Sequence, residues 1–330
     1  MNQAQQLQVR LGSVEEFSEL IGMTGWDADF RQLSRGPSEV TATMMGGESS
    51  LILKLGTAGQ VRQRALPPGG FVTMGLMTDS RASAKFGPVA VDWEALTHVE
   101  PGVGIDCVSN QYFGAYTLSF EERRLNRIAE ALQLSELDQK PGRLGRHQKA
   151  PPASLARIRA FIEAIYANLG AGNASARQNT IDALDNELPE ILLRAWHNGE
   201  VIPEPSRTNR TRALKRALDY INERPQSVIS VEELCRGSAC SISTLERIFR
   251  EYAGVSPKQY LTAIRLSGVR QSLLDPREPR NIGQLATDWG FWHMSKFAAD
   301  YRRMFRELPS DTRGISRDPQ FRQGLDWSAA

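Results

Sequence analysis

The residues best suited to binding chemistry lie in one short stretch near the C-terminus, residues 282–309. Phe297, Tyr301 and Phe305 recur every four residues, which predicts a helix with one aromatic face. The opposite face of that helix carries four cations: Lys296, Arg302, Arg303 and Arg306. Cations held on one helix face can pair with the phosphates of a nucleic acid, so we expect this helix to bind a polyanion.

A shorter helix is expected directly before the basic one. Apolar residues follow helical spacing from Ile282 to Trp289, and Asn281 with Gln284 has the pattern of a capping box. Gly290 then allows the positive φ that a sharp turn needs. Two short helices joined at a glycine, the second of them basic, are typical of a helix-turn-helix.

The same pattern occurs a second time upstream in the chain. The corresponding pairs are Leu234 with Leu285, Phe249 with Tyr301, and Pro257 with Pro309. The spacing is 51 residues for the first pair and 52 for the others, which a one-residue difference between the two turns explains. A helix over 257–274, opened by Ser256 with Gln259 three residues later, is expected to join the copies. A tandem pair is much more specific than a single helical hairpin.

This tandem region resembles the C-terminal DNA-binding domain of the AraC family of bacterial transcription regulators. The resemblance covers about the last third of the chain. The segment GFWHMSKFAADYRRMFRELPS is especially similar to the subgroup that contains the ethanolamine-utilisation operon regulator. The resemblance implies a cytoplasmic protein, associated with the nucleoid when bound to double-stranded DNA, that acts with RNA polymerase and forms a homodimer.

The resemblance also indicates which residues read DNA. The exposed positions are Ser243, Thr244, Glu246, Arg247 and Arg250 in the first copy, and His293, Met294, Ser295, Lys296, Ala299 and Arg302 in the second. Arg247 can bind guanine through two hydrogen bonds, and Glu246 can accept one from a cytosine amino group. Many family members have Arg where Ala299 stands, and Asp300 follows it here. We therefore expect weaker contact with the DNA backbone in this half.

Charge is divided unevenly along the chain, although the 330 residues sum to only +2. Residues 206–317 hold 20 Lys and Arg against 12 Asp and Glu, a net +8, and the remainder is net −6. Apolar residues make up 41% and charged residues 24%, as is ordinary for a globular protein. A basic module joined to an acidic one suits a polyanion-binding domain attached to a domain with another task.

The first 200 residues have a different pattern of apolar and turn-forming residues. Between about residues 39 and 120, short apolar runs alternate with glycine- and proline-rich breakers, which predicts five or six strands in a sandwich or barrel. Helices are expected over about 121–134, 154–169 and 175–198, with Pro189 as a kink. In the resembled family such a domain is a cupin-like ligand-binding or dimerisation module. The predicted fold is an α+β, cupin-like front domain followed by an all-α domain with two helix-turn-helix motifs.

The domain boundaries follow from these elements. We expect a sensor or dimerisation domain over 1–200, a linker over 201–209, the DNA-binding domain over 210–318 and a tail over 319–330. Residues 138–152 are rich in proline, glycine and charge, which predicts a loop. The helices over 154–198 have two alternative roles, packing on their own sheet or pairing of protomers. Leu184 and Leu188 are the residues expected to face a partner.

The sequence lacks the patterns of catalytic and metal-binding sites. The β-rich segment contains one histidine, His98, whereas a cupin enzyme commonly uses two or three beside a carboxylate. We find no phosphate-binding or nucleophile motif, and therefore expect no catalytic residue, metal or cofactor. Arg62 and Arg64 could bind an anionic ligand, and Trp93 could line an apolar pocket. The alternatives are an exposed strand face for the arginines and core packing for the tryptophan.

The sequence shows no sign of export or membrane insertion. The N-terminal MNQAQQLQVR lacks the apolar segment of a signal peptide, and no apolar run approaches ~20 residues. The three cysteines, Cys107, Cys235 and Cys240, are expected to be reduced thiols. The expected function is sequence-specific activation of a few operons in response to a small-molecule effector. Two alternatives remain, a front domain that serves a protein partner and a cupin-type enzyme with an accessory helical domain.

Overall fold

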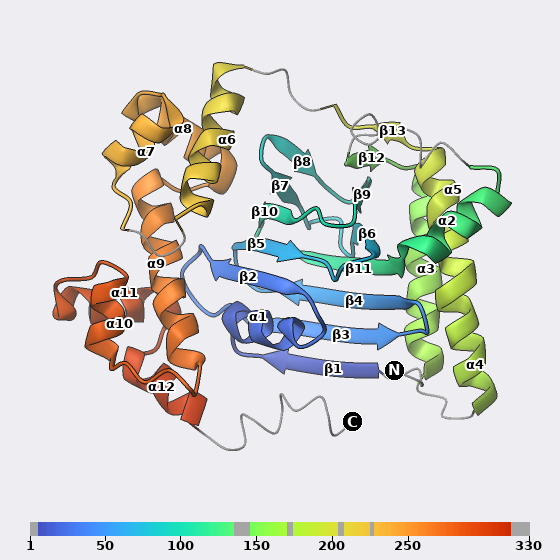
Figure 1. Cartoon of the computed structure of the whole chain (residues 1–330), viewed down its shortest axis with the longest axis horizontal. Coiled ribbons are helices and arrows are strands. Elements are labelled where there is room, and N and C mark those ends of the chain that lie inside the picture. The colour runs from blue at the N-terminus through green and yellow to red at the C-terminus, as the bar shows by residue number, and fades with distance from the viewer. Residues whose placement is uncertain (1–5, 135–145, 170–173, 204–207, 225–227, 318–330) are drawn as a thin grey trace.

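In the computed structural model, two antiparallel sheets lie between two groups of helices (Figure 1). The structure describes residues 6–134, 146–169, 174–203, 208–224 and 228–317. The predicted tail lies outside these ranges, and the predicted loop over 138–152 and linker over 201–209 lie partly outside them. The chain thus has a β-rich N-terminal part and a helical C-terminal part, as the sequence predicted.

The strands form one large and one small sheet. The large sheet has the order β1 (Gln6–Leu11), β3 (Val40–Gly46), β4 (Ser50–Thr57), β11 (Gly114–Glu121), β6 (Phe71–Met77), β9 (Ala95–Val99), β12 (His147–Lys149) and β13 (Glu200–Val201). The small sheet has the order β2 (Asp27–Gln32), β5 (Val61–Leu66), β10 (Ile105–Ser109), β7 (Ala84–Phe86) and β8 (Val89–Val91). The segment 39–120 holds nine strands, β3 to β11, where five or six were expected. Strands β1, β2, β12 and β13 were not predicted, and β12 replaces part of the loop expected over 138–152. Charged and amide side chains interrupt the apolar residues of β1 and β2.

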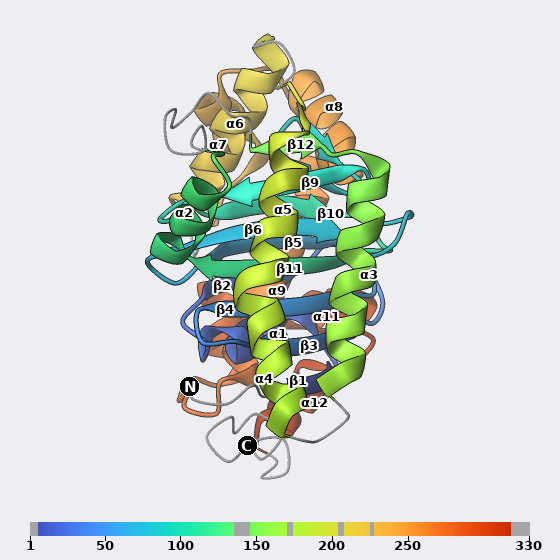
Figure 2. The ribbon, with the colours of Figure 1, turned by 90° about the vertical axis from the view of Figure 1, so that its right-hand side faces the viewer.

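One face of the large sheet is covered by helices (Figure 2). They are α2 (Glu122–Ala131), α3 (Pro152–Leu169), α4 (Ala174–Asp182), the π-helical turn η2 (Ala183–Glu187) and α5 (Leu188–His197). Leu184 and Leu188 are fully buried in the core between these helices and the sheet. The prediction that they face a partner protomer is therefore wrong. An apolar stripe identifies the buried side of a helix but does not say what buries it.

The predicted kink at Pro189 takes the form of the π-helical turn η2, so the helix expected over 175–198 is divided. Proline has no N–H, and its ring clashes with the carbonyl four residues earlier. That carbonyl, on Asp185, instead accepts a hydrogen bond from Arg124 Nε at 3.0 Å. The Asp185 side chain also binds the β3–β4 turn, accepting from Ser50 Oγ at 2.6 Å and Glu48 N at 2.9 Å.

The C-terminal helices contain both predicted helix-turn-helix copies. They are α6 (Asn209–Asn222), α7 (Val231–Ser238), α8 (Ile242–Ala253), α9 (Pro257–Leu274), α10 (Ile282–Asp288), α11 (Met294–Phe305) and α12 (Pro309–Arg317). Capping boxes at Ser230, Ser256 and Asn281 are present as predicted. Figure 1 shows α9 between the α7–α8 pair and the α10–α11 pair, and it contacts α8, α10 and α11.

The second face of the small sheet packs on the C-terminal helices along β2, β5 and β10. Leu33 and Val108 belong to the same apolar cluster as the core of those helices. Arg62 donates to Asp106 at 3.2 Å and to Asn222 of α6. Asn222 Nδ2 donates in turn to Asp106 Oδ2 at 2.9 Å. Helix α9 also packs on β2 and on α1 (Val14–Gly22), so the two parts of the chain share a hydrogen-bonded interface.

The burial of Leu188 predicts the outcome of introducing a charge there. Leu188→Lys should unfold the N-terminal part, because an unpaired ammonium in this core costs several kcal/mol. Loss of the cooperative thermal transition and of near-ultraviolet circular dichroism would report it. The matched control is Glu187→Lys, one residue earlier and exposed, which should melt like the wild type. A folded Leu188→Lys protein that scatters light as a smaller particle would instead place Leu188 at a protomer interface.

Candidate nucleic-acid interface and sandwich cavity

Helix α8 presents one polar face and buries the other. Its N-cap Ser241 accepts from Thr244 N at 3.3 Å, and it ends at Gly254, whose φ of 68° is the left-handed conformation that glycine favours. Its buried side consists of Leu245, Ile248, Phe249, Tyr252 and Ala253. This packing leaves the predicted DNA-reading residues on the accessible side.

The predicted residues of α8 differ in how free they are. Ser243, Arg247 and Arg250 are exposed, whereas Thr244 and Glu246 are half-buried. Glu246 Oε2 lies 3.6 Å from Arg250 Nε, an ion pair across one helical turn. Among the described residues, Arg247 has no ion-pair partner. Arg247 is therefore the cation of α8 that is available to an external acceptor.

Helix α11 is held by an aromatic ladder, as the sequence predicted. The ring centroids of Phe297 and Tyr301 are 5.7 Å apart and those of Tyr301 and Phe305 are 4.6 Å apart. Tyr301 Oη also lies 2.8 Å from Thr312 Oγ1 of α12. The six predicted residues all stay exposed: His293, Met294, Ser295, Lys296, Ala299 and Arg302.

The structure limits the effect of Asp300, which follows Ala299 at the position that departs from the family pattern. Asp300 Oδ1 lies 3.1 Å from Arg303 Nη1, so its charge is paired within the helix. Lys296 and Arg302 have no ion-pair partner among the described residues. Together with the exposed Arg306, which also has no ion-pair partner there, they are cations of this half that can reach a phosphate.

Helix α9 fixes the placement of both copies. On one side Tyr260 packs edge to face on Phe249 of α8, with centroids 5.1 Å apart. On the other side Gly268 lies against Trp289, and a Cβ at this glycine would be 2.2 Å from the indole ring. Contact this close requires glycine. The two recognition helices therefore project from one continuous, tightly packed helix.

Two further cations border α8. Arg212 and Arg216 of α6 line a polar hollow of about 390 Å³ together with Ser241 and Thr244 at the start of α8. A helix N-terminus attracts anions, and guanidinium groups pair with phosphate. The sequence reasoning did not single out these residues. Their spacing of four on the polar face of the 209–222 helix was the available signal.

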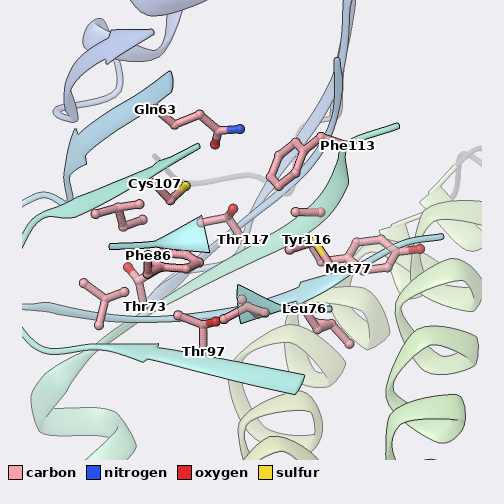
Figure 3. A pocket seen from close by; sticks show the side chains of 15 residues that line it. Gln63, Thr73, Leu76, Met77, Phe86, Thr97, Cys107, Phe113, Tyr116 and Thr117 are labelled. Atoms are coloured by element: carbon pink, nitrogen blue, oxygen red, sulfur yellow. The ribbon is translucent and has the colours of Figure 1, made fainter. Parts of the chain in front are cut away.

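A cavity of about 70 Å³ lies between the two sheets (Figure 3). Gln63 and Cys107 line it from the small sheet, and Thr73 and Thr97 from the large one. None of the described lining residues is charged at neutral pH, and burial raises the pKa of the Cys107 thiol, which stays protonated. Gln63 Nε2 is buried without a hydrogen-bond partner among the described residues.

A second cavity of about 40 Å³ adjoins the first and shares Gln63, Ile105, Phe113 and Thr117 with it. Trp26 lines this one, and its indole N–H is also buried without a partner. Buried donors normally find an acceptor, so two unpaired donors at one apolar hollow indicate space for a ligand oxygen.

The ligand candidates from the sequence lie elsewhere. Arg62 is only 2% exposed and points away from the sandwich cavity, so it does not lie on an exposed strand face as the alternative interpretation held. Trp93 packs under Arg159, whose guanidinium carbon is 3.2 Å from the ring centroid. Arg62, Arg64 and Trp93 line neither of these two cavities.

The described part of the chain has neither a metal-ligand cluster nor a membrane-spanning helix. No three His, Cys, Asp or Glu side chains come together there as a metal site would require. His98 packs on Trp196, and burial lowers its pKa. Within the same ranges, no helix has the length and apolar character needed to cross a bilayer.

Comparison with known proteins concerns mainly the C-terminal helices. A family described as a helix-turn-helix domain matches residues 234–315. The XylDLEGF operon transcriptional activator of Pseudomonas putida is 38% identical over 101 residues, which are 30% of this chain and 32% of that protein. A probable thc operon regulatory protein of Rhodococcus erythropolis is 31% identical over 97 residues, 29% of each chain. The chain thus spans about a third of the length of these curated relatives.

Two solved structures of regulators also align with the chain, both at a TM-score below 0.5. The AraC-like transcriptional activator CuxR has 13% identity and a TM-score of 0.42, covering 86% of this chain and 100% of that one. A probable AraC family transcriptional regulator from Rhodopseudomonas palustris CGA009 has 29% identity and a TM-score of 0.30, covering 32% of this chain and 98% of that one. The two curated relatives are described as regulators of operons, and the residues that match the helix-turn-helix family include α8 and α11. Residues 234–315 therefore match a helix-turn-helix domain family, and the curated relatives named above are transcription regulators.

Proposed function

We propose that the whole chain is a bacterial transcription activator that binds a bipartite site in double-stranded DNA. The observation that carries the proposal is the pair of recognition helices, α8 and α11, which present exposed polar faces from the single helix α9. Helices held this way suit successive major grooves ~34 Å apart. The protein would act in the cytoplasm, at the nucleoid, together with RNA polymerase.

The proposal also assigns the chain to a subgroup of the AraC family. The segment from Gly290 to Ser310 is similar to the ethanolamine-utilisation subgroup. The curated relatives are named for other operons, XylDLEGF and thc. The subgroup assignment therefore rests on the region of the second recognition helix. It does not identify the operons that the protein controls.

Replacing Arg247 and replacing Arg302 should affect DNA binding in different ways. Arg247→Ala should cost ~1–3 kcal/mol on the selected DNA site and relax specificity at one base pair. Arg302→Ala should weaken binding to every sequence alike and reduce the salt slope by about one charge. Fluorescence anisotropy at several salt concentrations measures both effects.

A site selected from random duplexes serves as the probe. Arg277→Ala is the control, because Arg277 is exposed and lies outside both recognition helices. An equal loss on every sequence from Arg247→Ala would remove it from the base-reading set.

The N-terminal part is proposed to pair protomers into a homodimer. Its net negative charge gives it little direct attraction to DNA, whereas pairing raises affinity through effective concentration. Since Leu184 and Leu188 lie inside the core, pairing has to use exposed residues of this part.

Full-length protein should therefore scatter light with twice the mass of the 36.7 kDa chain. Hydroxyl-radical footprints should contain, for each protomer, two protected segments ~10 bp apart. A monomer that stays monomeric on its DNA site would refute the pairing.

The sandwich cavities are the proposed effector site. Their described lining is mostly apolar and carries no charge, and Gln63 Nε2 and the Trp26 indole N–H are unpaired donors, so the ligand class is a small neutral molecule with an oxygen acceptor. A volume of about 70 Å³ limits this to roughly a single ring once the walls adjust. The alternative role, binding of a protein partner, would not use this narrow space between the sheets.

Strands β5 and β10 connect that site to the DNA-binding helices. Successive residues of a strand point to opposite faces. Gln63 and Cys107 face the cavity, while Arg62 and Asp106 hold Asn222 of α6. A ligand that draws Gln63 inward also moves the backbone that carries Arg62, and so changes how the domain is held.

Substitutions on the two faces of β5 test this route. Phenol, benzyl alcohol and benzaldehyde are the probes, with thermal shift and DNA affinity as readouts. Gln63→Leu should weaken ligand binding five- to tenfold, the effect of losing about one hydrogen bond. Asn222→Ala should bind the ligand normally while its DNA affinity no longer responds. If no neutral compound changes either readout, the cavity is not an effector site.

A further inference from the structure

Large apolar side chains are exposed at the start of both recognition helices. Ile242, the first residue of α8, is 54% exposed, and Met294, the first residue of α11, is 39% exposed. Trp292, two residues before Met294, is 72% exposed. Apolar surface is therefore exposed to water at the N-terminal end of each recognition helix, the end expected to enter a major groove.

Ile242 and Met294 occupy equivalent positions on their helices. Leu245 follows Ile242 by three residues and is buried, and Phe297 follows Met294 by three residues and is buried. Equal spacing from a core anchor gives both apolar side chains the same position on their helix. Neither contributes to the domain's core, so folding does not account for them.

The major groove offers one apolar group to such a residue. Thymine carries a 5-methyl group there, while the other base edges present hydrogen-bond donors and acceptors. We infer that Ile242 and Met294 contact thymine methyl groups, one in each half of the site, with Trp292 extending the apolar contact of the second half. The inference rests on the proposed DNA binding and adds a specificity element to it.

The surroundings of these residues favour DNA over a protein partner. Ser243 and Arg247 follow Ile242 on the same exposed face, and Ser295 and Lys296 follow Met294. Apolar groups enclosed by hydroxyls and unpaired cations complement a groove lined with bases and edged by phosphates. The residues also lie on two helices on different sides of α9 rather than in one continuous patch (Figure 1).

Removing single methyl groups from the DNA tests the inference directly. A site is selected from random duplexes with full-length protein, and each thymine is then replaced by deoxyuridine, which lacks only the methyl. At least one replacement in each half should weaken wild-type binding about fourfold, the equivalent of one buried methyl group.

The variants assign each methyl to its residue. Ile242→Ala should lose sensitivity to deoxyuridine in the α8 half alone, and Met294→Ala in the α11 half alone. Ile315→Ala, a control on α12 with 37% exposure, should keep both sensitivities. Thermal melts of the variants should match the wild type, because all three side chains are exposed.

Three results would overturn the inference. Wild-type protein could tolerate deoxyuridine at every thymine, or Ile242→Ala and Met294→Ala could keep the full methyl dependence. The variants could also bind DNA like the wild type yet fail to activate purified RNA polymerase, which would assign these residues to the polymerase. Selection that enriches no sequence at all is a different outcome, because it contradicts the proposed DNA binding itself.

Discussion

Strand β5 of the small sheet is covered on both faces, and the arrangement of the two parts of the chain depends on this. Strand alternation directs Gln63 into the sandwich and Arg62 toward the C-terminal helices. Burial acts to lower the pKa of Arg62, yet Tyr260 and Asp106 raise it on balance, so the group stays charged. A buried charge without its partner costs several kcal/mol. The helices therefore cannot slide along the sheet without separating Arg62 from Asp106 and Asn222.

A second buried arginine, Arg270, fixes the position of α9 relative to the N-terminal part. Arg270 lies 2.9 Å from Glu307 and 3.5 Å from Glu15, which joins α9 to the segment after α11 and to α1 of the N-terminal part. Arg31 adds a hydrogen bond to the Ile264 carbonyl at 3.3 Å. Apolar contact alone tolerates many relative orientations, whereas matched charges and hydrogen bonds permit few. Domain orientation is thus set by polar pairs within an apolar interface.

Local signals in the sequence were enough to predict the C-terminal domain. Capping boxes at Ser230 and Asn281 and the aromatic spacing from Phe297 depend on residues within a few positions of one another. The failures involve distant contacts. A helix stripe could not say whether Leu188 faces a sheet or a second protomer, and an alternating strand could not say that Arg62 is covered by another domain. The cavity arises between two sheets, so no single segment encodes it.

The net charge of the C-terminal domain does not show which of its cations are free to contact DNA. Several arginines of the basic domain are already paired, such as Arg303 with Asp300, Arg280 with Glu278, and Arg270 inside the interface. Their charges still add to the long-range field that attracts DNA. Short-range contact with phosphates depends on cations that have no partner to leave. Among the described residues, Arg247, Lys296 and Arg302 of the recognition helices meet that condition. Arg216 of α6, beside the start of α8, and Arg306, directly after α11, meet it too.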